Sequence, residues 1–256
     1  MKRYGSKWTH DESVLALGLY FQMPFVKIRS SAPEIVALAK LMGRSSASLS
    51  MKMDNFGRFD PSLSIKGITG LKNGSKLDRQ IWDEFANRRE DLALLYHELV
   101  QKLKGGDTLA DDEAIKTPPG MDGIRLAQYR INQSFFRKSV LSAYEYSCCI
   151  TGLTDTRLLI ASHIKPWAKC NSGNERTDAT NGLCLNALHD KAFDKGLITI
   201  DNNFKVVISR ALKDAIPHDT CVDYFVRYDG KRINLPSRGK PSESYLSYHR
   251  EHIFLS

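Results

Sequence analysis

The spacing of apolar and polar residues divides the chain into a helical first part and a mixed second part. In the first part, apolar residues recur every three or four positions, as they do on one face of a helix. Thr9 is placed to cap the first helix, and Gly43 stands where helices commonly end. The pattern predicts helices over about 10–20, 33–42, 46–56 and 76–103.

The second part combines helical periodicity with short runs typical of strands. A helix is expected over 124–146 and a strand over 157–164. Residues 183–195 are expected to be mostly helical after a short loop, and 197–208 to form a hairpin whose turn is Asp201-Asn202-Asn203. A closing helix is expected over 245–254. The predicted fold class is therefore α+β.

Residues 105–123 separate the two parts. They contain glycines, an acidic cluster and the sequence Pro118-Pro119-Gly120, which are signals of irregular structure. We therefore expect a helical domain over 1–104, a linker over 105–123 and a second domain over 124–256.

Composition sets the broad class of the protein. The apolar share of 42% is sufficient for a packed core. The chain contains no run of about 18 apolar residues, and no apolar stretch follows its basic start, so neither a membrane span nor a secretory signal is expected. Five irregularly spaced cysteines do not form a disulfide framework, which favours a reduced, cytoplasmic setting.

The net charge of +8 is concentrated before Gly105. A basic domain favours a polyanionic partner, because cations that neutralise phosphates release counterions. The alternative is charge that only keeps the protein soluble.

The residues with candidate chemistry lie in the second part. His163 stands at the end of a predicted strand, Asn181-Gly182 follows, and then come His189, Asp190 and Asp194. Asp190 and Asp194 are four residues apart and share a helix face. A neutral histidine can deprotonate water near pH 7, and a divalent cation can stabilise the charge that develops during phosphodiester hydrolysis.

Four sequence blocks carry a resemblance to a known family. They are Cys149-Ile150-Thr151-Gly152, Ser162 to Trp167, Asn181 to Leu185 and Leu188 to Ile198. In this order they resemble the HNH endonuclease family, which has a ββα-metal fold. The arrangement is similar to that of restriction-type endonucleases in which a helical DNA-binding module precedes the HNH domain.

The resemblance implies a role for each matching residue. His163 would be the general base, and Asn181 would fix the loop that orients it. His189 occupies the third letter of the motif, whereas Asp190 lies nine residues after the asparagine, where many relatives have their metal ligand. The two remain competing ligands, with Asp194 as support. The implied cofactor is Mg²⁺ or Mn²⁺, and the implied products are a 5′-phosphate and a 3′-hydroxyl.

The chain departs from the family pattern in two places. Ser162 stands where many relatives have a metal-binding Asp or His before the base, so it would hold a metal through water or only loosely. Cys149 has Gly152 where a Cys-x-x-Cys pair would have its second cysteine, so no structural zinc is expected.

The N-terminal helices resemble Myb-like helix-turn-helix modules. Trp8-Thr9-x-Asp11-Glu12 matches the start of such modules, and the sequence from Leu41 to Leu49 matches their turn into the last helix. The polar side of that last helix would face DNA, while Arg137 and Lys165 would contact phosphate. The alternative is a helical scaffold without DNA contact. The predicted residues on the last helix are Arg44, Ser46, Ser48, Lys52 and Asn55.

These features predict a metal-dependent endonuclease of the restriction type that acts on double-stranded DNA. Whether it requires modified bases is left open. One ββα site cuts one strand, so a double-strand break favours a homodimer. Two alternatives remain, namely a DNA-binding regulator with a decayed nuclease site, and a nicking or homing nuclease of a mobile element.

Overall fold

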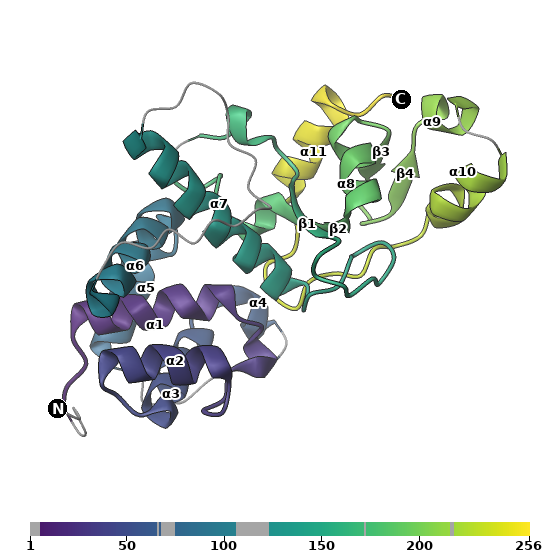
Figure 1. Cartoon of the computed structure of the whole chain (residues 1–256). Helices are drawn as coiled ribbons and strands as arrows, with labels where there is room; N and C mark the ends of the chain where they lie inside the picture. The colour runs from purple at the N-terminus through teal and green to yellow at the C-terminus, as the bar shows by residue number, and fades with distance from the viewer. Residues whose placement is uncertain (1–5, 66, 68–74, 106–122, 172, 216–217) are drawn as a thin grey trace. The chain divides into compact units, whose positions relative to one another are not determined.

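The computed structural model describes residues 6–65, 67, 75–105, 123–171, 173–215 and 218–256 (Figure 1). Helices predominate, and the strands are short. The chain divides into two compact units. Unit 1 comprises Met1–Ser142 with Asn171–Thr177, and unit 2 comprises Ala143–Cys170 with Asp178–Ser256. Most of the expected linker lies outside the described residues.

Unit 1 is helical. Its first helix begins with a capping box, in which Thr9 Oγ1 accepts a hydrogen bond from Glu12 N at 3.2 Å and a Glu12 carboxylate oxygen accepts one from Thr9 N at 2.9 Å. Gly43 ends the second helix in the left-handed conformation at φ 70°. The helices are α1 (His10–Gln22), η1 (Phe25–Lys27), α2 (Pro33–Met42), α3 (Ser46–Gly57), α4 (Pro61–Ser64), α5 (Lys76–Phe85), α6 (Arg89–Lys104) and α7 (Gly123–Ala143).

The helix predicted over 76–103 is two helices, α5 and α6. Arg88 leaves the helical conformation, with φ −133° and ψ 53°. Phe85 of α5 and Leu92 of α6 are both buried in one core. They are seven residues apart, so the helical period of apolar positions continues across the break and does not reveal it.

The core of unit 1 includes part of α7. Phe135 is 3% exposed and belongs to the same apolar cluster as Leu17 and Tyr20 of α1. In this unit, a Glu90 carboxylate oxygen also accepts a hydrogen bond from the Gly173 backbone. The compact units therefore divide after Ser142, whereas the sequence pattern placed residues 124–142 in the second domain.

Unit 2 is built around a strand–strand–helix element. The antiparallel strands β1 (Leu159–His163) and β2 (Gly182–Asn186) pair His163 with Gly182, and α8 (Ala187–Asp194) follows β2 directly. Asn186 caps α8 by accepting a hydrogen bond from His189 N at 2.9 Å. The prediction of mostly helix over 183–195 was wrong for its first residues, because a short strand buried on both faces has no alternating pattern.

Several more elements of unit 2 follow α8 in the chain. The predicted hairpin over 197–208 is present as β3 (Ile198–Ile200) and β4 (Val206–Ile208). Further helices are α9 (Arg210–Ala215), α10 (His218–Tyr224), η4 (Val226–Tyr228) and α11 (Glu243–His252). His249 of α11 stacks on Phe193 of α8 with ring centroids 3.7 Å apart. Leu188 of α8 is 46% exposed.

The last residues of the chain pass closely over Gly196. This glycine has φ 69°, and a Cβ atom there would lie 2.0 Å from the carbonyl oxygen of Ile253. Its own carbonyl accepts a hydrogen bond from Leu255 N at 2.9 Å. Only glycine fits this position without displacing the C-terminal segment.

Among the described residues, no helix combines the length and the apolar character needed to cross a membrane.

Candidate active site

His163 is the last residue of β1 and is partly exposed. Pro166 turns the chain directly after it into η2 (Trp167–Lys169). The Trp167 ring meets the imidazole edge to face, with centroids 5.6 Å apart and an interplanar angle of 90°. The structure thus presents His163 at the end of a strand, as the sequence predicts.

Asn181 ends η3 (Ala179–Asn181) and is completely buried. Its Oδ1 accepts a hydrogen bond from Lys165 N at 2.8 Å, and its Nδ2 donates to Lys165 O at 3.2 Å. Its backbone oxygen also accepts from Ile164 N at 2.9 Å. One side chain therefore holds both polar backbone groups of the second residue after His163, which fixes the start of the loop.

Cys170 is a further member of this arrangement, and sequence reasoning missed it. Its thiol donates to Lys165 O at 3.3 Å, and its sulfur accepts from Asn181 Nδ2 at 3.3 Å. Cys170 is 7% exposed. No spacing or pattern in the sequence links it to Asn181, since only the fold of the loop brings the two together.

Ser162 precedes His163 but lies on the other face of β1. It is 2% exposed, and its Oγ has no hydrogen-bond partner among the described residues. A buried hydroxyl without a partner is uncommon in proteins. It stands at the position where many relatives have a metal-binding residue.

His189 is not oriented as an open metal ligand. It is 3% exposed, and its Nε2 lies 2.8 Å from the carbonyl oxygen of Tyr224, to which it can only donate. The rings of Phe225 and Tyr228 meet it edge to face, each at 5.5 Å. This histidine anchors the segment that follows α10 through Nε2, while its Nδ1 is buried without a hydrogen-bond partner among the described residues, so His189 and Asp190 both stay predicted ligands.

Cys148 lies on the other side of His189. Burial raises the pKa of the Cys148 thiol, but its interactions with the His189 side chain and with Thr151 outweigh it and bring the pKa down to about 7. The sulfur also accepts a hydrogen bond from Asn186 N at 3.3 Å. These contacts tie Cys148 to the start of α8.

The remaining acidic residues of α8 face outward. Asp190 is partly exposed and Asp194 is exposed. Within the described ranges, no group of three or more His, Cys, Asp or Glu side chains could together hold a metal ion. This does not fit an all-protein zinc cage. It is compatible with Mg²⁺, which often takes one or two carboxylates and completes its shell with water and substrate phosphate.

Two of the cations predicted to bind DNA are buried in unit 1. The Arg44 side chain is 4% exposed and forms two hydrogen bonds with Glu12, at 2.7 and 2.9 Å. Lys52 is also 4% exposed and pairs with the buried Asp78. Both cations lie over the Trp8 ring. For Arg44 and Lys52 the structure gives an internal role in place of the predicted DNA contact, because neither can reach phosphate without leaving its partner.

The other predicted DNA contacts occupy less buried positions. Ser46, Ser48 and Asn55 of α3 are partly exposed, and Asn55 Nδ2 donates to Asp78 at 3.3 Å. Arg137 of α7 is partly exposed. Lys165 is the one predicted cation that lies beside His163, and its Nζ is 5.6 Å from the ring centroid of Tyr248. For these five residues the DNA contact stays a prediction.

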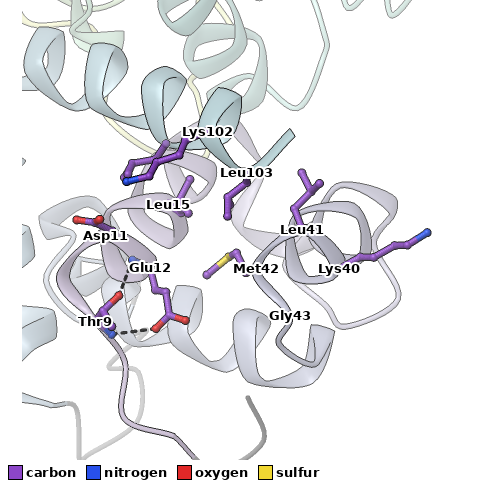
Figure 2. Close-up of a pocket in the computed structure, with 11 residues that line it drawn as sticks. Thr9, Asp11, Glu12, Leu15, Lys40, Leu41, Met42, Gly43, Lys102 and Leu103 are labelled. Atoms are coloured by element: carbon purple, nitrogen blue, oxygen red, sulfur yellow. Dashed lines mark hydrogen bonds between the residues drawn. The ribbon is translucent and has the colours of Figure 1, made fainter. Parts of the chain in front are cut away.

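A surface pocket of about 590 Å³ lies in unit 1, between α1, α2 and α6 (Figure 2). Leu15, Met42 and Leu103 give it apolar walls, and Lys40 and Lys102 stand at its edge. No histidine or cysteine lines it. Its residues belong to a different unit from His163, so it is not the candidate catalytic site.

Comparison with known proteins agrees with the strand–strand–helix geometry. Residues 148–201 match the family model described as HNH endonuclease. One similar solved structure is described as "Modification dependent TagI restriction endonuclease"; it is 18% identical, with a TM-score of 0.32, over 46% of this chain and 37% of that chain. A likeness at this TM-score carries no argument about function. No curated protein matches the chain. The matched segment contains β1, β2 and α8 and includes His163, Asn181, His189 and Asp190, so residues 148–201 form an HNH endonuclease domain.

Proposed function

We propose that the protein is an HNH-type endonuclease that hydrolyses phosphodiesters of double-stranded DNA, with His163 as general base. The observation that carries the proposal is the pair of hydrogen bonds between the Asn181 side chain and the backbone N–H and C=O of Lys165. Lys165 follows His163 closely, just after the end of β1. An active site needs its base held to within a fraction of an ångström, and a buried amide with three partners is suited to that task.

In this reaction His163 removes a proton from a water molecule while the water oxygen attacks phosphorus. The bond between phosphorus and the 3′ oxygen breaks, and that oxygen takes up a proton from solvent. The products are a 5′-phosphate and a 3′-hydroxyl. Trp167 packs edge-on against the imidazole and restricts the directions in which it can turn.

HNH nucleases generally use divalent metal ions. We propose Mg²⁺ or Mn²⁺ here, with Asp190 or His189 as the main protein ligand and Asp194 as support; the buried Ser162 hydroxyl, on the other face of β1, does not support the predicted role through water. When bound, such an ion stabilises the negative charge that develops on the phosphate and on the leaving oxygen. His189 stays the alternative ligand, because its Nε2 is engaged by the Tyr224 carbonyl but its Nδ1 has no hydrogen-bond partner among the described residues.

A supercoiled-plasmid assay tests the proposal. The wild type is expected to nick or linearise plasmid with Mg²⁺ or Mn²⁺, and EDTA is expected to stop it. His163→Ala should lower the rate at least about 100-fold, the usual contribution of a general base. His97→Ala serves as a matched control, because it removes a partly exposed histidine of unit 1. Metal-dependent cleavage that persists in His163→Ala would refute the assignment of the base.

A second candidate is a DNA-binding regulator whose nuclease site has decayed. It is favoured by the buried, partnerless hydroxyl of Ser162 and by the lack of a three-ligand group among the described residues. Intact DNA binding by the wild type, without cleavage under any divalent ion, would support it. Ser162→Asp would then be the informative variant, because it restores the acidic residue found in many relatives.

The restriction role, the dependence on base modification and the homodimer are also proposals. Parallel digestion of unmodified DNA and of DNAs with natural base modifications separates restriction of modified DNA from unspecific nicking. Sedimentation with and without DNA tests for the dimer. A product nicked in one strand only, from a monomer, would favour the nicking or homing alternative.

A further inference from the structure

The C-terminal segment, which lies outside the residues matched by the HNH family model, packs directly against the candidate active site. Ser242 N donates to the Thr180 carbonyl at 3.0 Å. Gly239 approaches so closely that a Cβ atom there would lie 3.3 Å from Thr180 Cγ2. Thr180 immediately precedes Asn181, so the segment from Gly239 to Ser242 is fixed beside the residue that holds the catalytic loop.

This anchoring places Lys240 near the loop. Lys240 is exposed and stands between two residues that both contact Thr180. Within the described part of the chain, its ammonium group has no ion-pair partner. A fixed backbone with an exposed, unneutralised cation is suited to contact a phosphate of a substrate that reaches His163.

A second contact comes from α11, which follows this segment (Figure 1). The Lys165 Nζ atom lies 5.6 Å from the centroid of the Tyr248 ring, within the range of a cation–π interaction. His252, one helical turn later, stacks on the same ring with centroids 4.4 Å apart and an interplanar angle of 9°. The stacked pair fixes a ring that in turn restricts the Lys165 side chain.

Two carboxylates of the neighbouring segments have partners of their own. Glu243 pairs with Arg250 of the same helix. Asp178 caps η3, where its Oδ1 accepts from Thr180 N at 2.9 Å. The Glu243 charge is thus balanced within α11, and Lys240 stands next to the residues that contact Thr180 as an exposed cation.

We infer that the C-terminal segment completes the substrate site: Lys240 contacts a DNA phosphate near the cut, and Tyr248 is a positioning residue that holds the Lys165 ammonium group toward a second phosphate. The inference rests on the proposed function in one respect, that the ligand is DNA. It adds two residues and a whole segment to a site otherwise confined to 148–201.

The experiment measures DNA binding without cleavage, using the full chain with His163→Ala and a fluorescent duplex over a range of salt concentrations. Lys240→Gln is expected to lower the slope of log K against log salt by about 0.9, the value for one lost phosphate contact. Tyr248→Leu is expected to weaken binding about two- to five-fold and to lower the slope as well. A merely structural role for Tyr248 would leave the slope unchanged.

Two variants serve as controls. Tyr248→Phe keeps the ring and should bind like the parent. Lys205→Gln removes an exposed lysine of the same unit, at the end of the β3–β4 turn, and should leave the slope unchanged. An unchanged slope in Lys240→Gln, an equal loss in Lys205→Gln, or equal binding by Tyr248→Leu and Tyr248→Phe would overturn the inference. If the binding assay gives the expected pattern but the wild type never cuts plasmid DNA, the inference stands and the proposed cleavage is refuted.

Discussion

Replacing Asn181 with alanine removes one side chain that makes three contacts in a fully buried place. The contacts are the bonds to Lys165 N and O and to the Cys170 sulfur, at 2.8, 3.2 and 3.3 Å. With each neutral hydrogen bond contributing about 0.5–1.5 kcal/mol net, losing the two backbone bonds lowers the free energy of unfolding by about 1–3 kcal/mol. The protein should therefore still fold while its catalytic loop loses its support.

The effect on cleavage should exceed the effect on stability. A shift of about 1 Å in a reacting group can cost about 100-fold in rate, so Asn181→Ala is expected to cleave plasmid about 100-fold more slowly. Asn181→Asp keeps the acceptor for Lys165 N but places an oxygen 3.2 Å from the Lys165 carbonyl, so it should be at least as slow. Cleavage rates and urea denaturation curves, measured on the same preparations, separate the two effects.

A double variant distinguishes positioning from direct catalysis. If Asn181 acts only by orienting His163, then His163→Ala with Asn181→Ala should be no slower than His163→Ala alone. Asn203→Ala is the matched control, since Asn203 is an exposed asparagine in the β3–β4 turn. A folded Asn181→Ala protein that cleaves within three-fold of the wild type would refute the reasoning.

Three further predictions concern stability, each measured by urea denaturation. Burial lowers the pKa of His249 to about 4, so the unfolded chain binds a proton below about pH 6.5 that the folded protein does not. The free energy of unfolding should therefore fall by up to about 3 kcal/mol as the pH is lowered from 6.5 to 4. The fall should be smaller in His249→Gln. An equal fall in both proteins would contradict this. Arg44→Ala leaves the buried Glu12 carboxylate unpaired and should cost about 3–5 kcal/mol, most of which Arg44→Met with Glu12→Gln should restore; a cost under about 1 kcal/mol would show that the pair is dispensable. Gly196→Ala should cost at least about 2 kcal/mol through its positive φ and its clash with Ile253, and an unchanged midpoint would mean that the C-terminal segment moves aside freely.

The sequence predicted the candidate site better than it predicted the boundaries of the fold. His163 and Asn181 could be found because their chemistry and order recur in a motif, and the structure places Asn181 directly before Gly182, the residue that pairs with His163. The strand at Leu183 to Leu185 could not be told from a helix, because both of its faces are buried. The periodicity of apolar positions identifies an element that is buried on one face. It cannot distinguish a strand from a helix where every residue is buried.

Burial also decided which of the predicted polar residues are available. Arg44 and Lys52 lie on what reads as a polar helix face, yet each has a buried carboxylate partner that is distant in sequence, Glu12 and Asp78. His189 similarly turns toward the Tyr224 carbonyl, 35 positions later. Pairings across such separations depend on the folded chain, so one sequence without its fold does not reveal them.

The membership of residues 171–177 in unit 1 has a consequence for how such proteins can be rearranged. The chain passes from one unit to the other three times, after Ser142, Cys170 and Thr177. A genetic crossover between 105 and 123 would supply the nuclease with a foreign helical module while retaining the short insert, whose Gly173 backbone binds Glu90 of the native module. Recombinants that exchange residues 1–105 alone should therefore inherit a mismatched insert and also a mismatched α7, whose Phe135 packs in the core of unit 1. Functional exchange requires that all three segments of unit 1 are exchanged together.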